Sequence, residues 1–306
     1  IPISNTYIPM KTKIPHLMLA CLLGSAPTSY AAVWDDGGVG NEWGTAENWV
    51  GDVYPVNETN TVNGNRTATQ STGTPGDSGQ IRIGNTTDGT LNITGGTLTA
   101  SAGNGAVNIG YNNGATGTLN MSGGTLVAVD LNIGFLGAGT TGIATVSGGT
   151  INLSDDLVLG NGTSTTSGEL TIVGDSATIN VGDNMTIAVN GTAELTFELG
   201  ATGVSTIDVT NIFDINSGAD LFIDGLNYTG GYNTVIDLVT FGSLGDSTWD
   251  SITIDNFLKP GGGEWTTSIN FDGDSMYLSV VPEPSSTALL GLGGLALMLR
   301  RKRSAA

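Results

Sequence analysis

The chain has almost none of the side chains that most catalytic and metal sites require. Its 306 residues include one histidine, His16, and one cysteine, Cys21, and both lie near the N-terminus. The remainder therefore offers no Ser-His-Asp or Cys-His machinery, no disulfide and no histidine or cysteine metal site. Carboxylate acid–base chemistry remains open.

Few acidic residues lie close together in the sequence. The groups are the doublets Asp35-Asp36 and Asp155-Asp156 and the stretch Asp272-Gly273-Asp274. Neighbouring residues of a strand point to opposite faces, so we expect neither doublet to form an acid/base pair by itself. We expect these aspartates to form turns or face solvent, and we expect the protein not to be an enzyme.

Basic residues are scarce as well, with nine Lys and Arg against 28 Asp and Glu. Residues 32–281 contain three of the basic residues (Arg66, Arg82 and Lys259) and 27 of the 28 acidic residues, since only Glu283 lies outside. This span therefore has a net charge near −24. Such a surface repels nucleic acid and anionic membranes and suits an extracellular protein. Calcium binding is a side hypothesis, although no EF-hand loop or Gly-Gly-x-Gly-x-Asp array is present. No other cofactor is expected.

The N-terminus has the features of a secretory signal peptide. Met10 is the expected start, and it precedes two lysines, apolar residues 14–23, and small residues at Ser29 and Ala31. This order of basic, apolar and small-residue parts predicts cleavage after Ala31. The alternative is a lipoprotein signal in Met18-Leu19-Ala20-Cys21, which would leave a shorter and interrupted apolar stretch.

What fills the chain instead is a repeat. Each copy begins with a short alternating motif that ends in glycine, and these glycines stand at positions 84, 110, 134 and 160. A period of about 25 residues is typical of a solenoid or another stacked array. A β-propeller is the structural competitor, but its blades need about 40 residues.

Alternation with period 2 inside each copy predicts strands. Each copy offers three strands, and a Gly-Gly pair between the second and third permits a tight corner. The positions predicted to line the core are Leu91, Ile93, Leu98, Val107 and Ile109. The positions predicted to stack outside are Asn92, Asn120, Thr145 and Thr171. We therefore predict an all-β fold, a right-handed parallel β-helix of about five coils over residues 81–211.

All five tryptophans flank the repeats: Trp34, Trp43, Trp49, Trp249 and Trp265. An open solenoid end exposes its core and its strand edges, so we predict β-rich caps that these rings help to close. Sugar stacking on exposed tryptophans is the alternative. The predicted organisation is upstream residues and signal peptide over 1–31, an N-terminal cap over 32–80, repeats over 81–211, a C-terminal cap over 212–280 and a tail over 281–306.

The Gly-Gly-Thr corners at 95–97, 123–125 and 148–150 resemble those of autotransporter-associated β-strand repeats and related secreted bacterial solenoids. The opening Trp34-Asp35-Asp36-Gly37-Gly38, followed by Trp43 and Asn48-Trp49, is similar to the start of such proteins. The resemblance implies a secreted solenoid. We see no amphipathic barrel strands that would make a translocator, so we do not expect an autotransporter.

The C-terminal segment 281–306 combines three parts in a set order. These are Val281-Pro282-Glu283-Pro284, an apolar run over 288–299, and Arg300-Arg301-Lys302-Arg303. The apolar run prefers hydrocarbon and the four cations favour the cytoplasmic face, which predicts a single transmembrane helix. The run reaches about 18 Å against a hydrocarbon core of about 30 Å, so residues back to 281 would have to contribute.

This tail resembles the PEP-CTERM sorting signal of Gram-negative bacteria, a type of tail also grouped as an ice-binding protein C-terminal domain. The resemblance implies that Pro282, Glu283, Pro284 and the basic residues 300–303 form a signal for exosortase, a membrane-embedded transpeptidase-like enzyme. It further implies export across the inner membrane to the cell envelope, surface or matrix, with membrane attachment through the tail before processing. A permanent anchor without processing is the alternative.

Three functions stay open. The favoured one is a structural or adhesive protein of the surface or exopolysaccharide matrix. The second is a polysaccharide-binding or polysaccharide-cleaving β-helix, which the scarcity of bases disfavours. The third is ice binding on a threonine ladder, predicted as Thr97, Thr125, Thr150 and Ser176 beside the irregular column Thr99, Val127, Asn152 and Thr178.

Overall fold

The computed structural model describes residues 31–112, 114–231, 233–258 and 264–281, all within one unit of the chain. The predicted signal peptide up to residue 30 and the predicted transmembrane helix therefore lie outside the described residues. Within the described part, the single helix is the 3-10 turn η1 (Ala46–Asn48), and no helix there is long and apolar enough to cross a membrane.

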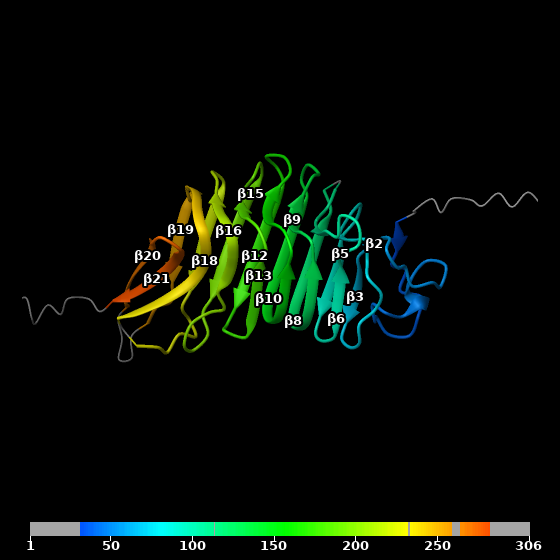
Figure 1. Cartoon of the computed structure of the whole chain (residues 1–306), viewed down its shortest axis with the longest axis horizontal. Coiled ribbons are helices and arrows are strands. Elements are labelled where there is room, and N and C mark those ends of the chain that lie inside the picture. The colour runs from blue at the N-terminus through cyan, green and yellow to red at the C-terminus, as the bar shows by residue number, and fades with distance from the viewer. Residues whose placement is uncertain (1–30, 113, 232, 259–263, 282–306) are drawn as a thin grey trace, which may run out of the picture. The chain divides into compact units, whose positions relative to one another are not determined.

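The described residues form a parallel β-solenoid of about seven turns, which confirms the predicted class (Figure 1). The first strands of the coils form one ladder: β1 (Ala32–Val33), β2 (Thr59–Val62), β4 (Gln80–Ile83), β7 (Val107–Ile109), β9 (Leu131–Phe135), β11 (Leu157–Asn161) and β14 (Met185–Ile187). The second strands form another: β3 (Arg66–Gln70), β5 (Gly89–Ile93), β12 (Ser167–Val173), β15 (Thr192–Glu198), β17 (Ala219–Asp224) and β19 (Ser251–Asp255).

Third strands complete the coils. They include β6 (Thr97–Ala100) and β13 (Ala177–Val181). The remaining strands of the coils run through a corner and serve two ladders: β8 (Thr116–Ala128), β10 (Thr141–Leu153), β16 (Ile207–Ile215) and β18 (Thr234–Ser247). After the last coil, β20 (Thr266–Phe271) and β21 (Ser275–Val281) pair antiparallel with each other, and β21 pairs antiparallel with β18.

The array is longer than the five coils predicted over residues 81–211. Strands β2 and β3 precede that span and pair in parallel with β4 and β5, and β16 to β19 extend the ladders to Asp255. These strands lack the Gly-Gly corner of the repeat, but parallel pairing needs only backbone groups and inward apolar side chains. Inward residues such as Val62, Leu221 and Ile223 supply the latter, since each is at most 1% exposed.

The core lies inside the coils where the alternation predicted it. The five predicted positions, Leu91, Ile93, Leu98, Val107 and Ile109, all have 0% exposure. The outer column is also confirmed, because Asn92, Asn120, Thr145 and Thr171 are register partners from coil to coil. The Asn120 amide nitrogen donates to Asn92 Oδ1 at 3.0 Å, which links two coils outside the backbone ladder.

Glycine allows the coils to approach at their corners. At the second corner, Gly124 has φ +74°, the left-handed region that glycine enters at little cost. Near the end of the first strand β9, Gly134 has φ +71°, and a Cβ placed there would lie 2.1 Å from the carbonyl oxygen of Ser167 on the next coil. The spacing of the repeat thus follows from two requirements, a turn and a close backbone contact.

Both columns of the predicted threonine ladder are wrong at their last member. Thr97, Thr125 and Thr150 stack as expected, but Thr178 follows them, and the neighbouring column ends on Asn180 instead of Thr178. Before the corner Val146 pairs with Ile172, and after it Thr150 pairs with Thr178, so the register offset between the two coils grows by two positions. The corner around Gly174 is therefore longer by that amount than the corner it stacks on, which shifts the alignment.

The N-terminal end of the solenoid is closed. Trp34, Trp43 and Trp49 are 0% exposed and pack together, with ring centroids between 4.9 and 6.2 Å apart. The backbone also covers the first coil, since Trp43 N–H donates to the Thr69 carbonyl at 2.6 Å and Val50 N–H to the Val33 carbonyl at 2.9 Å. Burial of these three rings rules out sugar stacking on them. Trp249 and Trp265, at the other end, are partly buried against the core.

Candidate functional site

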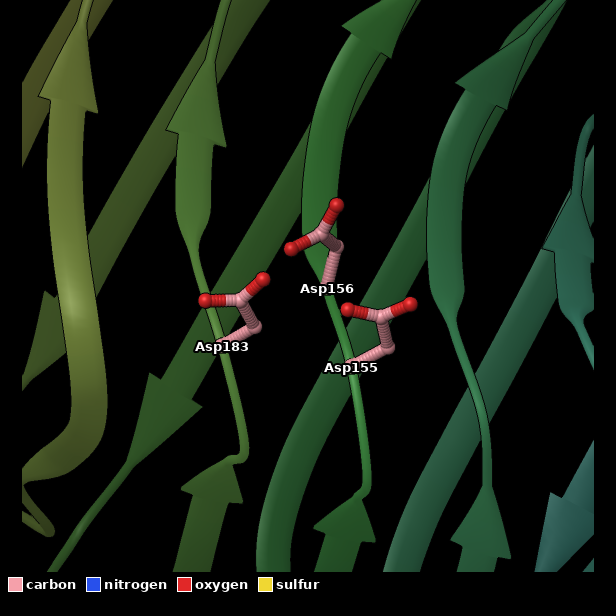
Figure 2. Close-up of side chains that lie close together, drawn as sticks. All are labelled: Asp155, Asp156 and Asp183. Carbon is pink, nitrogen blue, oxygen red and sulfur yellow. The ribbon is translucent and has the colours of Figure 1, made fainter.

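Three aspartates form a cluster on the turns between third and first strands. Asp155 and Asp156 lie between β10 and β11, and Asp183 lies between β13 and β14 on the next coil. The flanking strands pair Leu153 with Val181, so the turns are stacked, and Asp183 N–H donates to the Asp155 carbonyl at 3.0 Å. One carboxylate oxygen from each residue lies within 4.8 Å of the others (Figure 2).

The predicted separation of the Asp155-Asp156 doublet is therefore wrong. The expectation of opposite faces used strand geometry, whereas the expectation that these aspartates lie in turns is confirmed here. The two residues instead occupy a turn, where the alternation of side chains does not hold. Figure 2 shows both carboxylates on the same side of the chain, beside Asp183.

Hydrogen bonds extend the cluster along the stacked turns. The Asp156 backbone N–H donates to Asp130 Oδ1 at 3.3 Å, and Asn184 donates to Asp156 Oδ1 from its backbone at 3.0 Å and its side chain at 3.1 Å. On the following coil, Asn211 Nδ2 donates to Asp183 Oδ1 at 2.8 Å. Asparagine at these two positions supplies donors where further acids would add repulsion.

Electrostatic repulsion acts within the cluster. The charge of Asp156 raises the pKa of Asp155, with smaller contributions from burial and from Asp183. Burial raises the pKa of Asp130, and Asp155 and Asp156 add to this effect. The two described arginines serve elsewhere: Arg66 Nη1 donates to the Trp34 carbonyl at 3.1 Å, and Arg82 lies 4.1 Å from the Tyr111 ring centroid.

The cluster offers oxygen ligands alone, the type that Ca²⁺ prefers. Three carboxylates are fewer than the about six to eight oxygens that Ca²⁺ takes, so backbone carbonyls or water would have to complete the set. Calcium binding by this chain thus stays a prediction. Melting in Ca²⁺ against melting in chelator tests it, and equal melting temperatures would remove the hypothesis.

The other acidic groups occupy separate turns. Asp35 Oδ1 accepts the Gly37 N–H at 3.1 Å within the N-terminal cap. Asp272, between β20 and β21, accepts the Ser275 N–H at 3.1 Å and its hydroxyl at 2.9 Å, and these bonds lower the pKa of Asp272. Asp274 lines a hollow of about 430 Å³ with Asp208 and Asp237. The described structure brings neither Asp35 nor Asp272 to the cluster.

Acidic columns on the second-strand face were missed by sequence reasoning. One column stacks Glu169, Glu194 and Asp220, and a second stacks Glu198, Asp224 and Asp255. Burial raises the pKa of Glu169, and the Glu194 charge raises it further. The available signal was an acid directly before the inward leucine in three successive second strands, Glu169-Leu170, Glu194-Leu195 and Asp220-Leu221.

The predicted sorting signal lies almost entirely beyond the described residues. This applies to Pro282, Glu283, Pro284, Arg300, Arg301, Lys302 and Arg303, and also to Ser29 of the predicted cleavage site. Ala31 is described and exposed. Cleavage after Ala31 stays a prediction.

Comparison with known families identifies the tail. The family model described as the PEP-CTERM protein-sorting motif matches residues 280–303. Searches of the curated proteins and of the solved structures found no match. The motif indicates an extracellular protein sorted by exosortase and secreted through the cell envelope of a Gram-negative bacterium.

Proposed function

We propose that this chain is a structural or adhesive protein of the cell surface or exopolysaccharide matrix, without catalytic activity, which exosortase releases from the membrane. The observation that carries the proposal is the sorting motif at residues 280–303, which begins inside the last strand of a β-solenoid. The motif indicates where the protein is sorted, and the solenoid is the folded domain that is sorted. The matrix polysaccharide is the partner that this destination makes available.

Support for a structural role comes from the construction of the solenoid. Its coils carry stacked polar columns on the outside and one continuous apolar core inside. The described residues contain 27 acids and two arginines, a balance that keeps a secreted surface solvated. Acidic turn residues have hydrogen-bonding or repulsive neighbours, as at Asp272 and Asp155, and neither arrangement requires a substrate.

The proposed sequence of events follows from the charge and polarity of the two ends. The signal peptide directs export, the apolar run 288–299 stays in the membrane, and residues 300–303 stay on the cytoplasmic side. Exosortase then acts near Pro282, Glu283 and Pro284. Cleavage separates a basic tail from an acidic body. An anionic membrane surface repels this body, so the body should leave the membrane once the tail is removed.

Expression of the full chain in a host with exosortase, and in the same host without it, tests the sorting step. We expect the C-terminus to be cut near residue 282 in the first host and intact in the second, as measured by mass analysis of the purified protein. The protein should be found in the matrix and medium fractions of the first host and in the membrane fraction of the second. A variant with alanine at Pro282, Glu283 and Pro284 should behave as in the second host. Cys21→Ser is the control and should change nothing. An intact tail in the first host would leave a permanent anchor.

The non-catalytic part of the proposal has its own test. The released protein is incubated with neutral and acidic polysaccharides, and the reducing ends formed are measured. We expect no increase over buffer. An activity that Asp155→Asn or Asp274→Asn abolishes would contradict the proposal, because it would assign a carboxylate to catalysis.

A further inference from the structure

The C-terminal end of the coil stack has an open strand edge. Among the described residues, β19 pairs with β17, and no register joins its opposite edge to another strand. The other end of the same ladder differs, since residues 41 and 43 pair with the first coil through Thr69. Unpaired edges are normally blocked by lysine, proline or a bulge. The strand Ser251-Ile252-Thr253-Ile254-Asp255 contains no lysine and no proline, and it pairs with β17 without a bulge.

The core is also uncovered at this edge. Leu170, Leu195 and Leu221 occupy one inward column and are 2%, 0% and 1% exposed, whereas Ile252, the next member, is 46% exposed. Ile252 faces inward like its predecessors, but no further coil of the described chain covers it. This exposure fits an end that a further strand would complete.

We propose that two copies of this chain associate through β19, in an antiparallel pair with a two-fold axis at Thr253. The five residues are self-complementary in this register: Ser251 faces Asp255 of the second copy, Ile252 faces Ile254, and Thr253 faces itself. No two carboxylates lie directly opposite, and the isoleucines of both copies stay on the core side, so the apolar interior continues from one solenoid into the other. Any shift of the register loses strand pairs.

A thiol at the axis provides the sharpest test. Opposite residues in an antiparallel pair have Cα atoms about 4.5–5.5 Å apart, within the range of about 4.4–6.8 Å that a disulfide spans. The variant Thr253→Cys is made in the full chain with Cys21→Ser, which leaves no other cysteine. We expect mild oxidation to convert most of it into a covalent dimer. Ser164→Cys, at an exposed loop in the middle of the solenoid, is the matched control and should stay below a tenth as much dimer.

A mixing experiment tests the register. Ser251→Cys and Asp255→Cys should each fail to form a dimer alone and should form a covalent heterodimer when mixed. Formation of each homodimer in equal yield would overturn the proposed axis.

Sedimentation measures the association without chemistry. The full chain should show twice the monomer mass, and Ile252→Lys should return it to the monomer mass with an unchanged circular dichroism spectrum. Leu136→Lys is the control, because Leu136 is 50% exposed at a distant turn, and it should leave the dimer intact. A monomer at about 100 μM without a Thr253→Cys dimer would overturn the proposal. Dimerisation only after removal of residues 282–306 would overturn it too, since the tail would then be the occupant in the full chain. None of these three tests depends on exosortase processing.

Discussion

Substitution of Gly134 by alanine tests whether close contact between coils, in addition to its left-handed backbone conformation, requires glycine near the end of β9. Two costs combine at this position. The φ of +71° places the residue in the left-handed region, which costs a residue with a Cβ about 1–2 kcal/mol. The added Cβ would also lie 2.1 Å from Ser167 O, a backbone atom held in the parallel ladder. Since neither strand can move without loss of hydrogen bonds, we expect a total loss above about 3 kcal/mol.

Two other glycines separate these costs. Gly174 has φ +68° with no atom within 4 Å of a built Cβ, so Gly174→Ala should cost only the conformational part, about 1–2 kcal/mol. Gly142 has no positive φ, but its Cβ would lie 2.2 Å from Gly134 N and 2.3 Å from Ile109 O, so Gly142→Ala isolates the contact.

The assay is equilibrium unfolding in urea, monitored by circular dichroism. The dependence of the free energy of unfolding on urea concentration is compared among the variants. A changed slope would indicate that the stack no longer unfolds as one unit. The expected order of loss is Gly134→Ala, then Gly142→Ala, then Gly174→Ala. A Gly134→Ala variant that loses no more than Gly174→Ala would refute the reasoning, because the contact would then have no energetic weight.

Three further predictions concern charge and capping. The folded-state pKa values of Asp130, Asp155 and Glu169 are raised. The stability that these groups contribute is therefore complete below their unfolded-state pKa values and is lost as the pH rises through the raised values. The melting temperature should increase from pH 7 toward about pH 4.5, and a decrease over that range would contradict this prediction. Asp155→Asn should raise the melting temperature at pH 7 and reduce its dependence on salt, since it removes a repulsive charge; equal salt dependence in both proteins would count against the cluster. Trp49→Ala should lower the free energy of unfolding, measured in urea, by about 3–5 kcal/mol, because the ring is 0% exposed. Val39→Ala is the control in the same cap, and it should change this free energy by less than about 0.5 kcal/mol because Val39 is 99% exposed.

The regular part of the fold could be predicted from local patterns. Alternation placed Leu91 and Ile93 inside and Asn92 outside, because successive residues of a strand face opposite ways. The glycine period identified the stacking, because each coil repeats the same turn and the same close contact. The alternation is visible within one copy of the repeat, and the period is visible by comparing consecutive copies, so both can be recognised without knowledge of the tertiary contacts.

The ends of the array were harder to predict. Strands β2, β3 and β16 to β19 lack the Gly-Gly corner, so no pattern marked them as coils, although their backbones extend the same ladders. The open edge of β19 could not be predicted from local patterns either. Whether a strand has one neighbour or two depends on segments that lie elsewhere in the sequence.

By itself, the sequence determined the strand class, the coil period, the inward residues, the absence of histidine and cysteine chemistry outside the N-terminal segment, and the sorting motif at residues 280–303. Only the tertiary structure decided which residues become neighbours where the corners differ in length or the repeat is absent. Asp155 meets Asp183, and Thr150 meets Thr178, because the length of each corner sets the register of the next coil. A longer corner changes which residues pair after it until another corner compensates, as between Thr150–Thr178 and Ser167–Thr192, so side-chain columns and acidic clusters depend on turn lengths that the repeat does not specify.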